Sequence, residues 1–291
     1  MSKTDGLQAL EQPLASLPDT LRQLILERIQ NLTHYEPVIG IMGKSGAGKS
    51  SLCNALFRGE VSPVSDVNAC TRDVLRFRLR SGRHSLMIVD LPGVGENGQR
   101  DQEYRALYRR MLPELDLVLW VIKADDRALS VDEQFWHGVM QPYRQQVLFL
   151  INQADKIEPC HERDTCTSTL SAQQRANLQE KQGAITAMFT PCHPVCVVSA
   201  RTGWGTEEMV ATMMRCLPDR ATSPLATQLH GRLCTEPVRS QARDSFGEAV
   251  GRVFDTAESS SFLPAPLKAV IRTVRDAVVS VARAVWDWIF F

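Results

Sequence analysis

The sequence predicts an α/β protein, with one doubly wound, mostly parallel sheet and flanking helices at both ends of the chain. Three observations predict this fold class. Short apolar runs recur between residues 38 and 198, as expected of strands that are buried on both faces of a parallel sheet. Segments with helical periodicity lie between these runs. A glycine-rich turn joins the first run to the helix that follows it, which is typical of ligand-binding sheets of this class.

The composition is that of an ordinary globular chain and excludes several other classes. Of 291 residues, 44% are hydrophobic and 23% are charged, and Lys plus Arg equals Asp plus Glu at 33 each. Wholesale disorder would need lower hydrophobicity, and a balanced chain has no overall field that attracts nucleic acid. The sequence has no secretory signal at its start and no uncharged apolar stretch of 18 residues. We therefore expect a cytoplasmic protein whose eight cysteines are free thiols.

An amphipathic helix is expected ahead of the sheet, within residues 1–36. Asp19 is a candidate N-cap, and apolar residues recur at helical spacing over residues 21–32. The helix should end near His34, because Pro37 biases the residue before it to an extended conformation. We expect this helix to pack against the rest of the chain.

Strands and helices then alternate over residues 37–218, the predicted sheet domain. Strands are expected at residues 38–42, 75–80, 86–89, 117–122, 147–151 and 195–198. Helices are expected at residues 51–57, 101–111, 131–143, 170–189 and 206–216. Arginines alternate with apolar residues over 75–80, which predicts an edge strand guarded by charge.

The last quarter of the sequence divides into two parts. Residues 219–265 are rich in Ser, Thr, Ala, Pro and Arg, so we expect a loosely determined linker with weak helical signals near 238–254. Residues 266–291 predict an amphipathic helix that is apolar apart from one narrow charged face. Such a helix can pack internally, lie on the inner face of a membrane, or self-associate. Internal packing is the favoured alternative.

The glycine-rich turn after the first strand has the phosphate-binding pattern G-x-x-x-x-G-K-[ST] at every fixed position. Backbone N–H groups of such a loop, and the N-terminus of the following helix, favour bound phosphate. Lys49 should reach the β- and γ-phosphates, and the Ser50 hydroxyl should ligate Mg²⁺. The pattern therefore predicts a P-loop NTPase. Its predicted nucleotide-binding residues are Gly43, Lys44, Ser45, Gly46, Ala47, Gly48, Lys49, Ser50 and Ser51.

Three more motifs follow predicted strands and should lie at the same edge of the sheet. Asp90 can hold Mg²⁺ through water, and the Gly93 N–H can sense the γ-phosphate. Asp155 can accept hydrogen bonds from N1–H and the N2 amino group of guanine, two donors that adenine lacks. The Ala200 N–H can donate to guanine O6. The residues predicted to bind nucleotide at this edge are Asp90, Gly93, Asn152, Gln153, Asp155, Ser199, Ala200 and Arg201.

The motifs GKSGAGKS, DLPG, NQAD and SAR, in this order, resemble those of translation-factor-class GTPases, and within them the Era/TrmE-like branch. The longer segment from YEPVIGIMGKSGAGKSSLCNALF through VSDVNACTRDV is similar to the prophage-island YfjP/YeeP group of GTP-binding proteins. The motifs cover residues 37–217. The resemblance implies a Ras-like GTPase domain that binds GTP or GDP with Mg²⁺. It also implies that Thr71 closes onto Mg²⁺ and the γ-phosphate. The implied catalytic residues are Lys49, Thr71 and Gly93, and the implied metal-binding residues are Ser50, Thr71 and Asp90.

Three departures from the family pattern bear on activity. Val94 stands where Ras-like enzymes have a glutamine that orients water, so hydrolysis should be slow without a partner, a second subunit or a cation. Gly46 stands where potassium-activated members have an asparagine, which argues against potassium activation. Gln153 replaces the usual lysine and should lower the affinity for guanine, whereas Asp155 should preserve the specificity.

The motifs leave the biological output open. The alternatives are a switch at a membrane surface, a nucleotide-gated homodimer, and an Era-like ribosome or RNA assembly factor. The RNA alternative is disfavoured because no suitable GxxG loop follows residue 217, and an ATP-using kinase is remote. A metal site is also disfavoured, because its candidate ligands lack paired C-x₂-C spacing. These candidates are Cys160, His161, Cys166, Cys192, His193 and Cys196.

Overall fold

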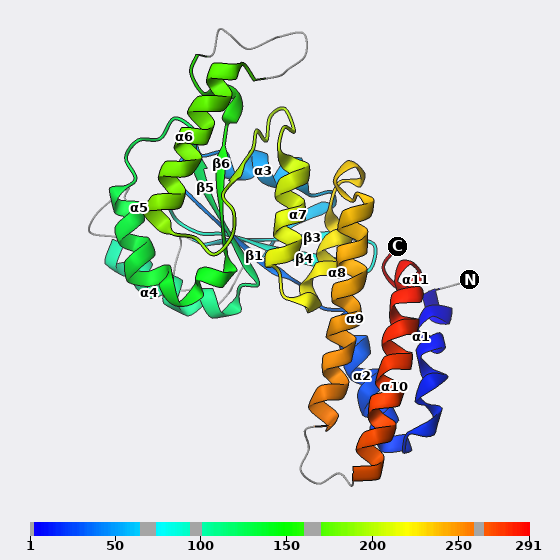
Figure 1. Ribbon diagram of the computed structural model, residues 1–291. Coiled ribbons are helices and arrows are strands. Elements are labelled where there is room, and N and C mark those ends of the chain that lie inside the picture. Colours follow the sequence, from blue (N-terminus) through cyan, green and yellow to red (C-terminus); the bar gives the residue numbers. More distant parts are fainter. Residues whose placement is uncertain (1–2, 65–73, 94–100, 160–169, 259–264) are drawn as a thin grey trace.

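The computed structural model describes residues 3–64, 74–93, 101–159, 170–258 and 265–291 (Figure 1). Within these ranges, seven strands form one sheet in the order β2-β3-β4-β1-β5-β6-β7. The pairs from β4 to β7 are parallel, whereas β3 pairs antiparallel with both β2 and β4. The strands are β1 (Val38–Met42), β2 (Glu60–Val64), β3 (Leu75–Ser81), β4 (His84–Asp90), β5 (Leu117–Lys123), β6 (Val147–Asn152) and β7 (Cys196–Val197). The predicted mostly parallel α/β sheet is confirmed.

Helices cover both faces of this sheet (Figure 1). Successive side chains of a strand point to opposite faces. Accordingly, Leu119 of β5 packs in a core with α3 and α7, whereas its neighbour Trp120 packs with α4, α5 and α6. The runs 117–122 and 147–151 are buried throughout, which explains why they read as continuous apolar segments. The helices are α3 (Lys49–Leu56), α4 (Asp101–Met111), α5 (Ser130–Phe135), α6 (Ala172–Phe189) and α7 (Thr206–Cys216).

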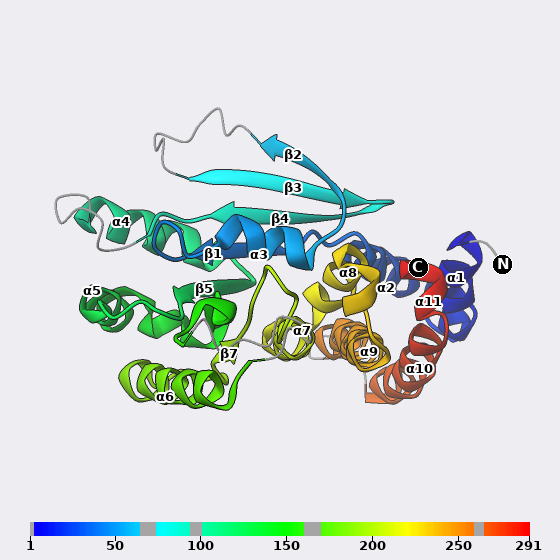
Figure 2. The same cartoon turned by 90° about the horizontal axis from the view of Figure 1, so that it is seen from above.

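A second group of helices stands beside the sheet and contains both ends of the chain (Figures 1 and 2). One continuous apolar core runs from β1 and β5 through α7 and α8 into α9, α10 and α2. The division at residues 36, 218 and 265 stays a prediction, because this core includes residues on both sides of each boundary. The helices of this group are α1 (Lys3–Glu11), α2 (Asp19–Thr33), α8 (Asp219–Gln228), α9 (Glu236–Glu258), α10 (Ala265–Ala284) and α11 (Trp286–Phe290).

The helix α2 ends at Thr33 with His34 as its C-cap, as predicted, but its start differs from the prediction. Pro18 is the N-cap and makes no side-chain hydrogen bond, while Asp19 is already helical. The Asp19 carboxylate accepts a hydrogen bond from Arg22 at 2.6 Å instead of capping backbone N–H groups. The N-cap assignment of Asp19 is therefore wrong, although its charge still lies in the first turn, where the helix dipole favours it.

The basic face of β3 does not lie at an edge of the sheet, contrary to the sequence prediction. Residues 60–64 form an additional strand, β2, which pairs with β3 on its outer side. Two of the β3 arginines form ion pairs with neighbouring segments: Arg78 with Glu36 at 2.7 Å and Arg76 with Glu114 at 3.3 Å. These two guanidinium groups are thus held by carboxylates of the same chain.

Residues 219–258 form two well-packed helices, α8 and α9, joined by residues 229–235, which differs from the expected loose segment. The helix α9 runs for 23 residues, and its buried stripe includes small residues such as Ala242, which give a weak sequence signal. Gly247 lets α10 lie close, since a Cβ there would lie 2.5 Å from the Arg283 side chain. The weak periodicity therefore reflects close helix contact and not a lack of structure.

The C-terminal segment forms two helices, α10 and α11, and packs inside the protein. The expected single helix is interrupted at Val285, which is the N-cap of α11. Ion pairs hold the charged side of α10 to α9, namely Arg272 with Glu258, Arg275 with Asp255, and Arg283 with Glu248. Its buried apolar residues are Ile271, Val274, Val278 and Ala282. These side chains do not lie on a surface that a membrane could contact.

None of the described helices combines the length and the apolar character that crossing a membrane requires.

The helix α3 is joined directly to the second helical group. The Arg58 N–H donates to Gln228 O at 2.7 Å, and the His230 N–H donates to Leu56 O at 3.0 Å. Phe57 and Leu229 form a β-bridge between these two bonds. The C-terminal end of α3 is therefore fixed to the segment that follows α8.

We expect Trp286→Ala to lower the free energy of unfolding by about 3–5 kcal/mol. Trp286 is fully buried, and its Nε1 donates to Ser223 Oγ at 2.8 Å. Urea denaturation followed by circular dichroism measures the change. The matched control is Trp288→Ala, because this tryptophan of the same helix is 40% exposed, and its removal should cost less than about 1 kcal/mol. Equal losses in the two variants would contradict the packing of α11.

Candidate nucleotide-binding site

The phosphate loop, residues 43–50, leads from β1 into α3 and depends on glycine at two positions. Gly43 has φ +144°, and a Cβ there would lie 2.2 Å from Val121 O. Gly48, the N-cap of α3, has φ +86°, and a Cβ there would lie 2.6 Å from Asn152 Nδ2. Both the positive φ and the close approach exclude larger residues. The predicted loop therefore has the tight backbone path that phosphate binding requires.

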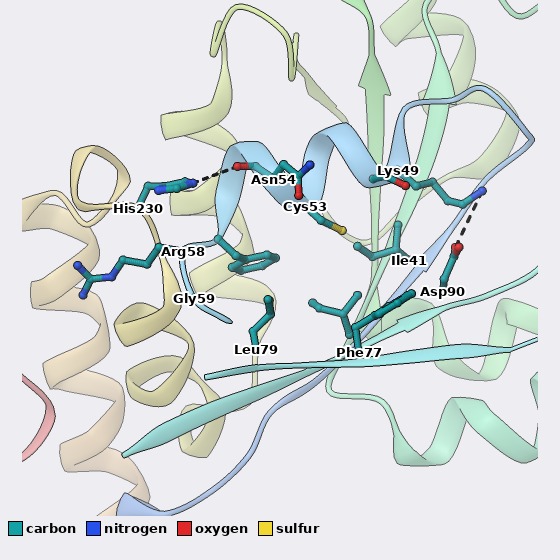
Figure 3. A pocket seen from close by; sticks show the side chains of 13 residues that line it. Ile41, Lys49, Cys53, Asn54, Arg58, Gly59, Phe77, Leu79, Asp90 and His230 are labelled. Atoms are coloured by element: carbon teal, nitrogen blue, oxygen red, sulfur yellow. Dashed lines mark hydrogen bonds and ion pairs between the residues drawn. The ribbon is translucent and has the colours of Figure 1, made fainter. Parts of the chain in front are cut away.

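Lys49 and Asp90 meet beside this loop (Figure 3). Lys49 Nζ donates to Gly43 O at 2.8 Å and lies 4.0 Å from Asp90 Oδ1. Burial raises the pKa of Asp90, and the Lys49 ammonium offsets part of this rise. Asp90 Oδ1 is buried and accepts no hydrogen bond from the described residues. A buried oxygen without a donor fits the hydration shell of a divalent cation.

Ser50 lines the same cavity as Lys49 and Asp90. The structure therefore brings together two of the three predicted metal-binding residues, Ser50 and Asp90. Thr71, the third, lies outside the described residues, and so does Val94.

The backbone at Gly93 lies directly against the phosphate loop. A Cβ on Gly93 would lie 2.9 Å from Gly43 O and 3.2 Å from Lys44 Cα. Two hydrogen bonds hold this segment in place, from the Leu91 N–H to Ile41 O at 2.8 Å and from Tyr108 OH to Pro92 O at 2.7 Å. The backbone of Gly93 therefore lies close to the phosphate loop, as the predicted role of its N–H requires.

Asn152 connects the phosphate loop to the loop at residues 199–201. It is buried, its Nδ2 donates to Ala47 O at 2.9 Å, and its Oδ1 accepts from the Ala200 N–H at 3.1 Å. The Ala200 N–H was predicted to donate to guanine O6, whereas in this structure it is already engaged by Asn152. Gln153 also reaches the phosphate loop, because its Nε2 donates to Gly46 O at 2.7 Å.

Asp155 receives hydrogen bonds on both carboxylate oxygens. Ser199 Oγ donates to Oδ1 at 2.6 Å, and Arg201 Nε donates to Oδ2 at 2.8 Å. Burial alone would raise the pKa of Asp155, but these donors outweigh it and hold the pKa below its usual value. The carboxylate predicted to choose guanine is therefore ionised near neutral pH and held at a fixed position.

Lys44 of the phosphate loop forms a charged cluster with Asp126 and Asp132, which was not predicted. Lys44 Nζ lies 3.0 Å from Asp126 Oδ2 and 3.0 Å from Asp132 Oδ2. Lys44 was predicted to bind nucleotide, whereas in the structure its side chain is directed to these carboxylates. The available signal was the acidic segment after the strand at 117–122, since residues that follow a parallel strand lie at the ligand edge.

A cavity of about 530 Å³ lies between α3 and the strands β3 and β4 (Figure 3). Lys49 and Asp90 are at one end of it, and Arg58 and His230 are at the other. Burial raises the pKa of the Cys53 thiol, which lines this cavity, to about 12, so the thiol is unreactive at neutral pH. This cavity could not be predicted from the sequence, because it depends on how far α3 lies from the sheet. The remaining lining residues are Ile41, Ser50, Asn54, Phe57, Gly59, Phe77, Leu79 and Ile88.

The described residues contain no group of three or more His, Cys, Asp or Glu side chains that could hold a metal ion. Cys192 is an exposed free thiol, and His193 Nε2 lies 2.8 Å from Gln145 O. Cys160, His161 and Cys166 lie outside the described residues.

We expect Asn152→Ala to weaken the binding of GDP by about tenfold to a hundredfold, because it leaves Ala47 O and the Ala200 N–H without their common partner. Fluorescence titration with a labelled GDP measures the effect. Asn177→Ala is the control, because Asn177 is half-buried on α6 and bonds only to Gln173 and Glu158 O among the described residues. Unchanged affinity in Asn152→Ala would contradict this connecting role.

The comparisons with known proteins agree with this geometry. Residues 38–153 match the family model described as 50S ribosome-binding GTPase. The chain is 55% identical to the Escherichia coli protein YkfA and 54% identical to YfjP, in both cases over all 291 residues and the full length of the relative. It is 27% identical to the tRNA modification GTPase MnmE of a Roseiflexus species over 92% of this chain, which spans about half (55%) of that protein.

A solved structure of Era, in complex with MgGDPNP and part of 16S ribosomal RNA, is similar with a TM-score of 0.45 and 23% identity, covering 64% of this chain and 58% of that one. The full-length likeness to YkfA and YfjP and the GTPase motifs at the sheet edge together lead to one conclusion. The chain belongs to the family that includes YkfA and YfjP, and its residues 38–153 carry the GTPase domain of that family.

Proposed function

We propose that the chain is a slow, Mg²⁺-dependent GTP hydrolase that acts as a nucleotide switch. The observation that supports this best is the position of Asn152, which bonds Ala47 of the phosphate loop and Ala200 of the opposite loop at once. A buried side chain with two such bonds fixes the spacing between the two loops. A nucleotide between them would have its phosphates at the N-terminus of α3 and its base beside Asp155.

Charge stabilisation at the phosphates is the proposed catalytic contribution of this chain. Lys49 provides the cation, and the loop amides with the N-terminus of α3 provide aligned dipoles. Gly93, whose backbone adjoins Gly43, provides an N–H that would respond to the γ-phosphate. Asp155 selects guanine. Because Val94 cannot orient a water molecule, we propose that hydrolysis is slow until a partner completes the site.

Ser50 and Asp90 are suited to the Mg²⁺ that phosphoryl transfer requires. Ser50 would hold the ion directly and Asp90 through water, and Thr71 is the third residue proposed for this role. The unsatisfied Asp90 Oδ1 supports this assignment. When bound, Mg²⁺ neutralises charge on the phosphates.

The test is nucleotide binding and phosphate release by the purified full chain. We expect GTP to be hydrolysed at a low rate, GDP to bind at least about a hundredfold more tightly than ADP, and hydrolysis to stop when EDTA removes Mg²⁺. Preference for ATP, or hydrolysis that persists in EDTA, would contradict the proposal. Cytoplasmic location and homodimer formation stay predictions, and light scattering with and without a GTP analogue tests the latter.

A ribosomal target is the second candidate for the output of the switch. The observation that favours it is the description of the matching family model, which names the 50S subunit. We expect the chain with a GTP analogue to co-sediment with 50S subunits, and to do so less with GDP. A chain that stays in the supernatant in both nucleotide states would exclude this candidate.

A further inference from the structure

Arg201 pairs with the carboxylate of Asp155, which the proposed function assigns to guanine. It lies at Oδ2, the oxygen to which Ser199 does not donate, and we call this the open side of the carboxylate. Arg201 Nε and Nη2 lie 2.8 Å and 2.7 Å from the same oxygen, Asp155 Oδ2. The two side chains differ in burial, since Asp155 is 3% exposed and Arg201 is 67% exposed. Among the described residues, both the hydrogen bond and the ion pair of the Arg201 side chain go to Asp155.

Ser199 holds Asp155 from the other side and does not compete with a base. It is buried, and its hydroxyl donates to Oδ1. A carboxylate has about four acceptor positions, so this bond can persist while another group binds. When Arg201 leaves, Asp155 therefore keeps the Ser199 hydroxyl as a donor and is not left as an unpaired buried charge.

The guanidinium and the guanine edge are chemically alike. Arginine offers parallel N–H donors in a planar fork, and guanine offers N1–H and the N2 amino group in the same manner. Both require the open side of Asp155, and the two cannot occupy it together.

We propose that Arg201 is an internal competitor of guanine: it binds Asp155 in the free protein and lowers the affinity for guanine nucleotides. This inference rests on the proposed function. It assigns Arg201 a role opposite to that of an ordinary nucleotide-binding residue, because removing it should strengthen binding. A moderate affinity of this origin would let nucleotides exchange without a dedicated exchange factor.

The experiment compares the wild-type chain with Arg201→Ala, Arg201→Lys and the control Arg232→Ala. Arg232 borders the same loop from the other side, since its Nη1 lies 2.7 Å from the place of a Cβ on Gly203, and it bonds Ala55 O. The Arg232→Ala substitution removes one positive charge, as Arg201→Ala does, but it does not remove a partner of Asp155. The affinities for GDP and for inorganic pyrophosphate are measured by calorimetry at low and high NaCl.

We expect Arg201→Ala to bind GDP roughly threefold to tenfold more tightly at low salt, as an ion pair with one exposed partner implies. The difference should shrink at high salt, because ions screen the competing pair. Arg201→Lys should lie between the wild type and alanine, because lysine lacks the fork. Pyrophosphate affinity should not change, because pyrophosphate does not reach Asp155, and Arg232→Ala should bind GDP as the wild type does.

Equal or weaker GDP binding by Arg201→Ala would overturn the inference, and so would a gain that is the same for pyrophosphate. A wild-type chain that binds pyrophosphate but shows no preference for GDP over ADP would refute the proposed function itself. The two failures are therefore distinguishable.

Discussion

Replacing Lys49 with alanine is expected to reduce GTP hydrolysis by at least about a hundredfold. Removal of one preorganised charge-stabilising group typically has an effect of this size. In the structure Lys49 Nζ is held by Gly43 O at 2.8 Å and faces Asp90, so the ammonium is already positioned before any phosphate arrives. Phosphate release under single-turnover conditions measures the chemical step separately from binding.

The fold should tolerate this substitution, because Lys49 lies in the first turn of α3 and is not one of the apolar residues that form the core. The melting temperature serves as the check on folding. Lys268→Ala on α10 is the control for loss of a lysine elsewhere, and it should hydrolyse GTP as the wild type does. Full hydrolysis by Lys49→Ala would contradict the proposed mechanism.

Asp155→Asn is expected to weaken GDP binding by about a hundredfold or more and to make xanthosine diphosphate the better ligand. The carboxylate accepts from two donors of guanine, whereas an amide offers one acceptor oxygen and an NH₂ group. That NH₂ group would face the guanine N2 amino group, so one donor would be left unpaired at a cost of about 1–3 kcal/mol. Xanthine has an oxygen at this position and restores the match.

Competition of the two diphosphates against a labelled nucleotide measures this preference. The control is Asp125→Asn, because Asp125 is 57% exposed and pairs with Lys123 at 3.5 Å and not with Asp155. It should keep the preference of the wild type for GDP. A variant at Asp155 that still prefers GDP would show that the base is read elsewhere.

The sequence was sufficient for the parts of the site that follow buried strands. The apolar runs at 38–42, 86–89, 117–122 and 147–151 are typical of buried strands of a parallel sheet, and their carboxyl ends meet at one edge. Lys49, Asp90, Asn152 and Asp155 therefore could be assigned together. Their mutual bonds could not, because a motif gives residue types and spacing but not which loop donor is already engaged, as the Ala200 N–H is by Asn152.

The parts that the sequence did not predict owe their structure to contacts between distant segments. The strand β2 contains Pro63, which argues against a central strand but is tolerated at an edge. The helix α9 has Gly247 and Gly251 in its interior, which lower helix propensity but allow Arg283 and Arg275 of α10 to lie across it. Such compensation by a partner helix is not visible in a single segment.

The short helix α3 couples the position of the phosphate loop to that of residues 228–230 in the second helical group. Its first residue, Lys49, belongs to the phosphate loop, and the residues after its last turn are fixed to the segment at 228–230. Eight residues span about 12 Å, too short a rod to absorb a displacement by bending. A tilt of the phosphate loop must therefore either carry residues 228–230 with it or break the bonds at Leu56 and Arg58.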